Sequence, residues 1–438
     1  MRTKQFHTVK HPEVFNNQLL IWAQQFDDVV WLDSNTLLGS ENTYKEQNYA
    51  SYDTVLAVDA FTGIQTDFVE GFTKLKEYQS HTKDWIFGYL TYDLKNDVER
   101  LESHNFDGLQ FPDLYFFQPK KLFLIKGSTL EIQYLNCVDD EIESDLETIL
   151  LIQNQPEENT LNNIHIKPRT DKKRYLKKVD TLLQHIHRGN LYEANFCQEF
   201  YSENTTIDPL ETYRKLNAIS RPPFASFLKC QDKYLISASP ERYIKKDQDR
   251  IISQPIKGTS KRSSNAKEDE QLKNNLFLDP KERSENVMIV DLVRNDLSKT
   301  ALRGSVKVEA LCDIYTFQQV HQMISTVSSR VAAQTHPVDI LKSTFPMGSM
   351  TGAPKISAME IIEELEDAKR GLYSGAVGYI TPEQDFDFSV VIRSILYNDS
   401  EKYVSFSVGS AITTKSDPYK EYEECLIKAK AMRKVLEA

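Results

Sequence analysis

The segment FPMGSMTGAPKISAMEIIEELE, residues 345–366, joins a glycine-containing turn to an apolar pattern that predicts a helix over residues 354–366. A turn that leads into a helix can point backbone N–H groups at an anion. The G-x-x-x-x-G-K-[ST] spacing of a phosphate-binding P-loop is absent. Taken alone, the segment fits an ordinary junction between a loop and a helix better than a binding site, so the surrounding segments decide its meaning.

Two other segments predict helices that begin at an Asp-Pro pair, with Asp as the cap and Pro at the first helical position. Each helix would place acidic side chains on one face: Glu282, in the position of a capping-box carboxylate, and Glu285 in the first, and Glu421 and Glu424, followed by Lys428, in the second. If these faces meet, the carboxylates need protons or a divalent cation, and oxygen ligands favour magnesium. The alternative is that both are solvated helix faces, where most Glu residues lie.

The segment QPIKGT, residues 254–259, reads as the end of a strand followed by a glycine turn that would lift Lys257 clear of the sheet. Most lysines are solvated cations. A nucleophilic lysine would need its pKa moved from ~10.4 to near 7, at a cost of roughly 4–5 kcal/mol. These residues alone leave both interpretations open.

Composition excludes several classes of protein. The net charge of the 438 residues is -11 and no long basic run is present, which argues against a nucleic-acid partner. The five cysteines are scattered without a C-x-x-C pair, as expected for a reduced cytoplasmic protein. There is no apolar segment of signal-peptide or membrane-spanning length, so we expect neither secretion nor a membrane association.

The organisation of the chain favours an α+β fold, because strands and helices do not alternate regularly. Residues 1–135 read as short strands, and the acidic, Asn-rich residues 139–170 predict a surface connection. A longer helix is expected over residues 171–188, and strands are expected over residues 196–201, 224–229 and 234–239.

Seven ordered segments resemble the chorismate-utilising enzymes, over roughly residues 165–435. They are SASPERY (237–243), PIKGT (255–259), ENVMIVDLVRNDL (285–297), FPMGSMTGAPKISAMEIIEELE (345–366), LYSGAVGYI (372–380), SVVIRSI (389–395) and EYEECLIKA (421–429). The resemblance implies two large antiparallel β-sheets packed face to face, with helices outside and the site between them. It implies an N-terminal subregion, residues 1–150, that is only loosely similar, and a chorismate-binding catalytic region, residues 165–438, in one compact unit.

The same resemblance assigns roles to individual residues. Glu285 and Glu424 would hold Mg²⁺, with Glu282 and Glu421 nearby, and the metal would grip a ring carboxylate of chorismate. Glu241 would be the general acid or base toward the C4 oxygen or the incoming amine, although a Glu that merely caps the segment after Pro240 is the alternative. The positions implied to bind substrate are Gly258, Thr259, Ser349, Tyr373, Arg393, Gly409, Ser410, Ala411 and Lys428.

Lys257 distinguishes branches of the family. Anthranilate-forming members resemble PIAGT here, whereas members that aminate chorismate at C4 resemble PIKGT. This implies that the Lys257 amine attacks C2 and displaces the C4 hydroxyl, after which ammonia adds at C4 and expels the lysine. The product would be 4-amino-4-deoxychorismate, a precursor of 4-aminobenzoate and folate. Water-adding members have a lysine where this chain has Glu193, so hydration is disfavoured.

Two alternatives stay open at this stage: an anthranilate-forming enzyme, and an inactive scaffold that binds an amidotransferase. The chain departs from the anthranilate-forming pattern at Gln322, where a His is expected, and His321 stands one residue early. No glutaminase signature is present, so we expect ammonia to come from a separate glutamine amidotransferase subunit in a heterodimer.

Overall fold

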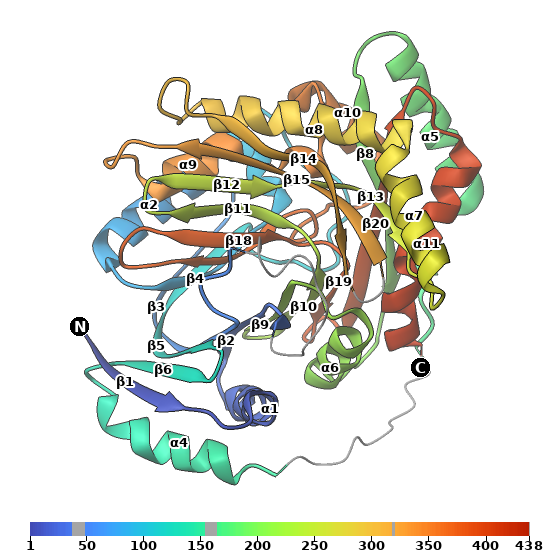
Figure 1. Ribbon diagram of the computed structural model, residues 1–438. Helices are drawn as coiled ribbons and strands as arrows, with labels where there is room; N and C mark the ends of the chain where they lie inside the picture. Colours follow the sequence, from blue (N-terminus) through green and yellow to red (C-terminus); the bar gives the residue numbers. More distant parts are fainter. Residues whose placement is uncertain (37–48, 154–163, 318–319, 438) are drawn as a thin grey trace.

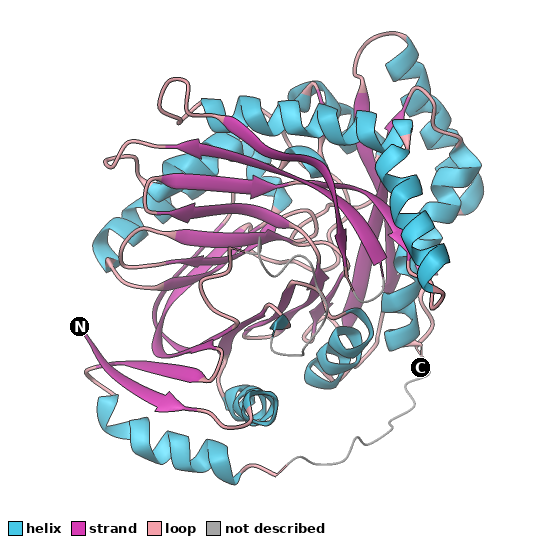
Figure 2. Cartoon of the chain, viewed as in Figure 1, coloured by secondary structure: helices cyan, strands magenta, loops and turns pink. Residues whose placement is uncertain are grey.

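Two layers of antiparallel strands face each other, with helices on their outer sides (Figure 1, Figure 2). The computed structural model describes residues 1–36, 49–153, 164–317 and 320–437. Hydrogen bonds connect twenty strands within these residues. The expected α+β fold of two large antiparallel sheets with helices outside is confirmed, with the addition that the two sheets are joined by shared strands.

The first layer runs from the N-terminal strand to the strand that carries Glu193. In order of pairing, it contains β1 (Arg2–Thr8), β6 (Thr129–Leu135), β5 (Leu114–Lys126), β3 (Thr54–Thr66), β2 (Asp28–Asp33), β9 (Phe224–Cys230), β10 (Lys233–Ser239), β19 (Ser394–Asn398), β20 (Tyr403–Thr413) and β8 (Glu193–Ser202), with the two-residue strands β7 (Lys167–Pro168) and β16 (Gly352–Ala353) against β8.

The second layer runs from the other halves of β3 and β5 to the strand that carries Lys257. In order of pairing, it continues with β4 (Ile86–Leu90), β17 (Ala376–Ile380), β18 (Phe386–Val390), β11 (Arg242–Asp247), β12 (Arg250–Gln254) and β15 (Val320–Arg330), which also pairs with β13 (Ile256–Lys261) and β14 (Lys307–Thr316).

Strands β3 and β5 belong to both layers. One half of β5 pairs with β6 and the other half with β4, while β3 follows β5 along its whole length and shifts register between Ala60 and Thr62. A register shift of this kind bends a strand and increases its twist. The long antiparallel pair of β3 and β5 therefore extends from one layer into the other.

Alternating side chains explain why the first layer is covered on both faces. On β2, Val29 and Trp31 join the cluster packed under the outer helices, and Trp31 donates a hydrogen bond to the Tyr213 hydroxyl at 3.1 Å. Val30, between them, joins the cluster shared with the second layer. Successive residues of a strand point to opposite faces, so one strand supplies both cores.

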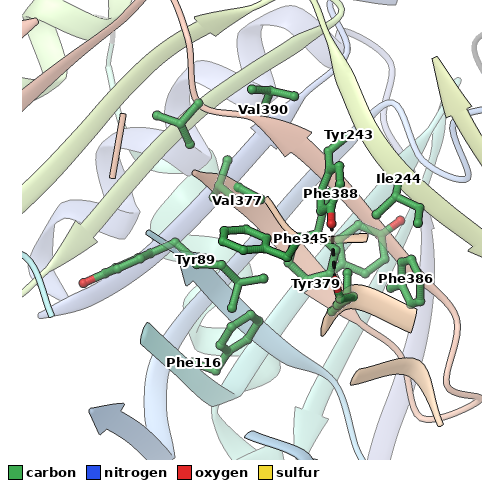
Figure 3. Close-up of a cluster of buried hydrophobic side chains, with 14 of the residues drawn as sticks. Tyr89, Phe116, Tyr243, Ile244, Phe345, Val377, Tyr379, Phe386, Phe388 and Val390 are labelled. Carbon is green, nitrogen blue, oxygen red and sulfur yellow. Dashed lines mark hydrogen bonds between the residues drawn. The ribbon is translucent and has the colours of Figure 1, made fainter. Parts of the chain in front are cut away.

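The core of the second layer is rich in aromatic side chains (Figure 3). Phe116 and Phe388 pack edge to face with ring centroids 6.1 Å apart, and Tyr243 and Phe345 do the same at 6.3 Å. The Tyr243 hydroxyl also lies 2.7 Å from Thr344 Oγ1. These contacts pack the strands around Tyr243 and the loop at Phe345 firmly beside the candidate site.

The helices divide between the two outer faces. Those on the first layer are α1 (Pro12–Trp22), α4 (Ile142–Leu151), α5 (Lys172–His187), α6 (Pro209–Ser220), α10 (Lys355–Leu365) and α11 (Pro418–Leu436). Those on the second layer are α2 (Gly71–Thr82), α7 (Ala266–Leu278), α8 (Pro280–Ser298) and α9 (Pro337–Thr344), and a short α3 (Lys95–Val98) follows β4. The helices expected after residues 171, 279, 354 and 417 are all present.

The expected surface connection over residues 139–170 is partly wrong, because α4 lies within it. Ile142 and Ile149 of α4 are buried with the helices of the first layer. Residues 154–163 of that segment lie outside the described residues. The regions 1–150 and 165–438 share both layers, since β2 pairs with β9 and β4 pairs with β17.

Candidate active site

A β-bulge aims Lys257 into the space between the layers. Pairing of β13 with β15 shifts register between Ile256 and Thr259, and Gly258 has a φ of 89°. Its positive φ is a conformation that other residues rarely adopt. A Cβ added at Gly258 would also lie only 3.1 Å from Glu282 Oε2, so a larger side chain would crowd this carboxylate. The expected turn after a strand is therefore wrong in form, because Gly258 lies inside β13.

The ammonium group of Lys257 reaches across to the opposite layer. Its Nζ donates a hydrogen bond to Glu193 Oε1 of β8 at 2.8 Å. Glu193 is 1% exposed. The pKa of Lys257 is lowered by burial, but the neighbouring carboxylates, Glu193 above all, outweigh burial and leave it above its ordinary value. The resting site therefore holds a buried ion pair between the two sheets.

Glu241 lies beside this pair, between β10 and β11. Burial raises the pKa of Glu241 to about 7, against the opposing effects of a hydrogen bond from Ser349 and the charges of Lys257 and Arg393. A cavity lined by Glu241, Ser349 and residues of α8 opens next to it. The structure thus brings Glu241 close to three other residues singled out from the sequence, which are Lys257, Ser349 and Arg393.

The guanidinium of Arg393 is available to a ligand. Arg393 follows β18 with a φ of 51°. Burial lowers its pKa, with the charge of Glu241 acting in the opposite direction. Within the described residues, its side chain makes no hydrogen bond and no ion pair closer than 4 Å. Arg393 is partly buried, and a partly desolvated cation without a contacting anion suits an anionic ligand.

The acidic faces of α8 and α11 meet. Lys281 of α8 has its Nζ 3.7 Å from Glu285 Oε1 on the same helix and 3.7 Å from Glu421 Oε1 on α11, so its ammonium lies near a carboxylate of each helix. Burial raises the pKa of Glu285 to about 7. Burial also raises that of Glu282, to which the charge of Glu424 adds. The alternative of solvated helix faces is therefore wrong for Glu285 and Glu421, which are 7% and 3% exposed.

The donor set suits a hard divalent cation. Glu285 Oε1 and Glu421 Oε2 are buried without a hydrogen-bond partner in the described chain. The described side chains contain no preformed cluster of three or more His, Cys, Asp or Glu residues around a metal position. Carboxylate oxygens without His or Cys are ligands that Mg²⁺ accepts, with water completing its shell. These oxygens without hydrogen bonds fit such an ion, and the ammonium of Lys281 now lies 3.7 Å from one oxygen of each carboxylate.

Several expected substrate positions line β20 and its neighbours. Lys428 Nζ donates to the Gly409 carbonyl at 2.9 Å and lies 2.7 Å from Glu424 Oε1. Burial raises the pKa of Glu424, but Lys428 outweighs it and leaves that pKa below its usual range. A Cβ at Gly409 would meet Cys197 Sγ at 2.5 Å, so the strands approach too closely there for any other residue.

The remaining expected positions differ in their exposure. Tyr373 is buried and its hydroxyl lies 3.7 Å from Cys197 Sγ. The Ser410 side chain lies on the same face of β20 as Val408 and Ile412, which pack under the helices, and its hydroxyl is buried without a hydrogen-bond partner in the described chain, so only the backbone of this residue can face a substrate. Ala411 is partly exposed on the same strand, and Thr259 is exposed at the end of the bulge.

Two helix starts show how their local hydrogen bonds are used. In the turn that precedes α10, Met350 N–H donates to the Met347 carbonyl and Thr351 N–H donates to the Gly348 carbonyl, so these two groups are used within the turn, as in the ordinary junction that the segment favours. At the start of α8, Asp279 accepts hydrogen bonds from the N–H groups of Lys281 and Glu282. The Glu282 side chain lies instead against Gly258, so the reciprocal half of the capping box is absent.

His321 has a structural environment. Its ring nitrogens lie 3.1 Å from Asp269 Oδ1 and 3.0 Å from Thr316 Oγ1, and the side chain is 1% exposed. Gln322, the next residue on β15, is buried with both amide atoms unpartnered within the described chain. Sequence reasoning missed the pairing of Glu193 with Lys257 and the position of Lys281; only the adjacency of Lys281 to Glu282 hinted at the latter.

Comparison with known proteins agrees with this arrangement. Residues 34–434 match the chorismate binding enzymes, and the chain belongs to this family. Aminodeoxychorismate synthase of Streptomyces griseus is 34% identical over 368 residues, which are 81% of this chain and 50% of that protein. Aminodeoxychorismate synthase component 1 of Bacillus subtilis is 32% identical over 365 residues, 80% of this chain and 76% of that protein.

A solved structure shows the same fold. Anthranilate synthase component I from Streptococcus pneumoniae superposes with a TM-score of 0.75 at 26% identity, covering 86% of this chain and 91% of that chain. This chain therefore spans most of some relatives but only half the length of the Streptomyces griseus protein. In the part of the chain that the structure describes, no helix is long and apolar enough to cross a bilayer.

Proposed function

We propose that this chain aminates chorismate at C4 to 4-amino-4-deoxychorismate, the activity after which the Streptomyces griseus and Bacillus subtilis relatives are named. The observation that supports this most strongly is the position of Lys257, whose Nζ lies between the layers beside Glu241 and Glu193. Lysine attacks only as the free amine, so its proton must first pass to a neighbouring carboxylate. Its amine would attack C2, and ammonia would then replace it at C4.

Glu241 is the proposed proton donor to the departing C4 hydroxyl. With a pKa of about 7, the carboxyl is partly protonated at neutral pH, whereas an ordinary glutamate is ionised. Hydroxide is a poor leaving group, and proton transfer of this kind contributes ~10²–10⁴ to a rate. The carboxylate left behind can then take a proton from the amine that adds at C4.

Chorismate carries two carboxylates, and the site offers cations to both. We assign one to Arg393, whose guanidinium contacts no anion of the described chain, with Tyr373 and Lys428 and the backbone of Gly409, Ser410 and Ala411 completing the pocket. Ser349, Gly258 and Thr259 form its other wall. A planar guanidinium can bind a carboxylate through two parallel hydrogen bonds.

We propose that Glu285 and Glu424, with Glu282 and Glu421 nearby, hold Mg²⁺. The unpaired carboxylate oxygens of Glu285 and Glu421 support this assignment. Bound there, the ion would neutralise the charge of a substrate carboxylate and fix the ring. The Lys281 ammonium would then have to move away from Glu285 and Glu421.

The deciding experiment is a product assay with chorismate, Mg²⁺ and ammonium, analysed by mass spectrometry. We expect 4-amino-4-deoxychorismate, which a separate lyase converts to 4-aminobenzoate. The similarity to the Streptococcus pneumoniae structure favours anthranilate formation as the second candidate, and anthranilate with pyruvate would establish it. Unchanged chorismate would instead favour an inactive scaffold that binds an amidotransferase.

Glutamine alone is expected to give no product, because we propose that ammonia comes from a separate glutamine amidotransferase subunit. The isolated chain should use ammonium at high concentration, and addition of an amidotransferase subunit should make glutamine a substrate. Product formation is measured with each nitrogen source in turn. Turnover with glutamine by the isolated chain would contradict the proposed partner.

The product would enter folate synthesis, and the proposed compartment is the cytoplasm. The five cysteines support a reducing compartment, since all are free and four of them are buried.

A further inference from the structure

The ion pair between Lys257 and Glu193 links the two layers at the centre of the site. Glu193 opens β8, and its backbone pairs with Thr413 of β20 on one side and with Ala353 of β16 on the other. Its backbone is therefore fixed by two neighbouring strands, and its side chain is 1% exposed. Lys257 Nζ lies 2.8 Å from Oε1, within direct hydrogen-bond contact.

One carboxylate oxygen of Glu193 accepts a hydrogen bond, and the other accepts none in the described chain. Within the described chain, Oε2 is buried without a hydrogen-bond partner, and Lys257 is the side chain that donates to Oε1. No other donor of the described chain competes with Lys257 for this carboxylate, so the contact between Nζ and Oε1 is the direct path for a proton between the two groups.

Other carboxylates act on Lys257 only at a distance. Glu285 and Glu241 influence its pKa through their charge, and neither forms a hydrogen bond to its Nζ in the described structure. A proton moves efficiently only along a hydrogen bond of about 2.6–3.2 Å or through one water. The geometry therefore singles out Glu193 among the three acids.

We propose that Glu193 accepts the proton that Lys257 must lose before its amine can attack the substrate. This rests on the proposed function. The transfer converts an ammonium and a carboxylate into an amine and a carboxylic acid, and both are neutral, which suits a buried site. The proposal goes beyond a structural ion pair, because Glu193 would then touch the reacting nitrogen.

The protons and electron pairs balance through the cycle. The Nζ lone pair forms the bond to C2, the ring double bonds shift, and the C4–O bond breaks as Glu241 protonates the leaving hydroxide to water. Ammonia then forms the C4–N bond, and the C2–N bond breaks with its electron pair returning to Nζ. Finally, the C4 ammonium gives a proton to Glu241, and Glu193 returns its proton to Lys257.

The test is Glu193→Gln, which keeps the size of the side chain and an oxygen that can accept from Nζ, but cannot hold the proton. We expect kcat for ammonium-dependent amination to fall by about 10²-fold or more while the KM for chorismate changes by less than about threefold. Glu193→Asp, which restores a carboxylate one methylene shorter, should recover part of kcat. The intact-mass adduct at Lys257, trapped during turnover, should decrease in Glu193→Gln.

Glu199→Gln is the matched control, since Glu199 is a buried acid on the same strand that pairs with Arg169 away from Lys257. Its kcat per folded molecule should equal that of the wild type. In a Lys257→Arg background, Glu193→Gln should cause no further loss. Thermal unfolding of every variant separates lost chemistry from lost fold, and Glu193→Asn, which also cannot hold the proton, serves if the Gln variant does not fold.

The outcomes distinguish this role from the proposed function. A wild type that turns chorismate over, with Glu193→Gln at an unchanged kcat, overturns only the role of Glu193. An equal further loss in the Lys257→Arg background overturns it as well, because the effect would not pass through the lysine. A wild type that leaves chorismate unchanged overturns the proposed function and, with it, this role.

Discussion

Lys257→Arg is expected to lower kcat for amination by about 10²-fold or more. Arginine keeps a positive charge facing Glu193 but does not lose its proton, so it cannot form the bond to C2. Free ammonia would then have to react without the lysine, whereas well-oriented intramolecular groups reach effective molarities of ~10⁵–10⁸ M. The measurements are kcat at saturating ammonium and the mass of the trapped protein adduct.

Lys261→Ala is the control for this change, because Lys261 is an exposed lysine on the same strand, β13. Its kcat should match the wild type. Thermal unfolding of Lys257→Arg should remain close to that of the wild type, since the ion pair with Glu193 is kept. A variant that folds and turns over at the wild-type rate would show that Lys257 is not the nucleophile.

Glu285→Gln is expected to abolish Mg²⁺-dependent amination while the fold is retained. The amide keeps an oxygen but loses the negative charge that attracts the cation, and Mg²⁺ is usually held through carboxylates together with water. Without Mg²⁺, the variant should be more stable than the wild type at pH 8, since burial raises the pKa of Glu285 in the folded chain to about 7. Folded wild type binds more protons than unfolded wild type between about pH 4.3 and 7, so its stability falls as pH rises through that range.

The measurement is urea unfolding of both proteins in EDTA at pH 5 and pH 8, together with a Mg²⁺ titration of activity. The stability difference should be larger at pH 8, because glutamine does not titrate. Glu423→Gln on the exposed face of α11 is the control and should change neither quantity. Wild-type activity of Glu285→Gln at low Mg²⁺ would contradict the metal assignment.

Local signals in the sequence predicted helix starts well and distant pairings poorly. Asp279 and Asp417 each cap a helix through neighbouring N–H groups, which depends on residues only two or three positions away. The partner of Lys257, in contrast, lies 64 residues earlier in the chain. No spacing rule relates the two, so their contact follows only from the packing of one layer against the other.

Charge misled the prediction for residues 139–147. Their acids suggested a surface connection, although Ile142 and Ile149 lie seven residues apart and form the buried stripe of α4. For Glu285 and Glu421, the ordinary preference of glutamate favours exposure, whereas the resemblance of the surrounding segments predicted a shared site. Tertiary packing buries both side chains, and their spacing within each helix does not show this.

The shared strands β3 and β5 have a consequence for any attempt to divide the chain. A fragment that lacks the N-terminal strands would lose the partners of β9 and β17, leaving one open edge in each layer. Unpaired edges of this kind recruit other chains and lead to aggregation. The N-terminal third contributes none of the candidate site residues. By pairing with β9 and β17, it covers strand edges through which residues 165–438 would otherwise associate with other chains.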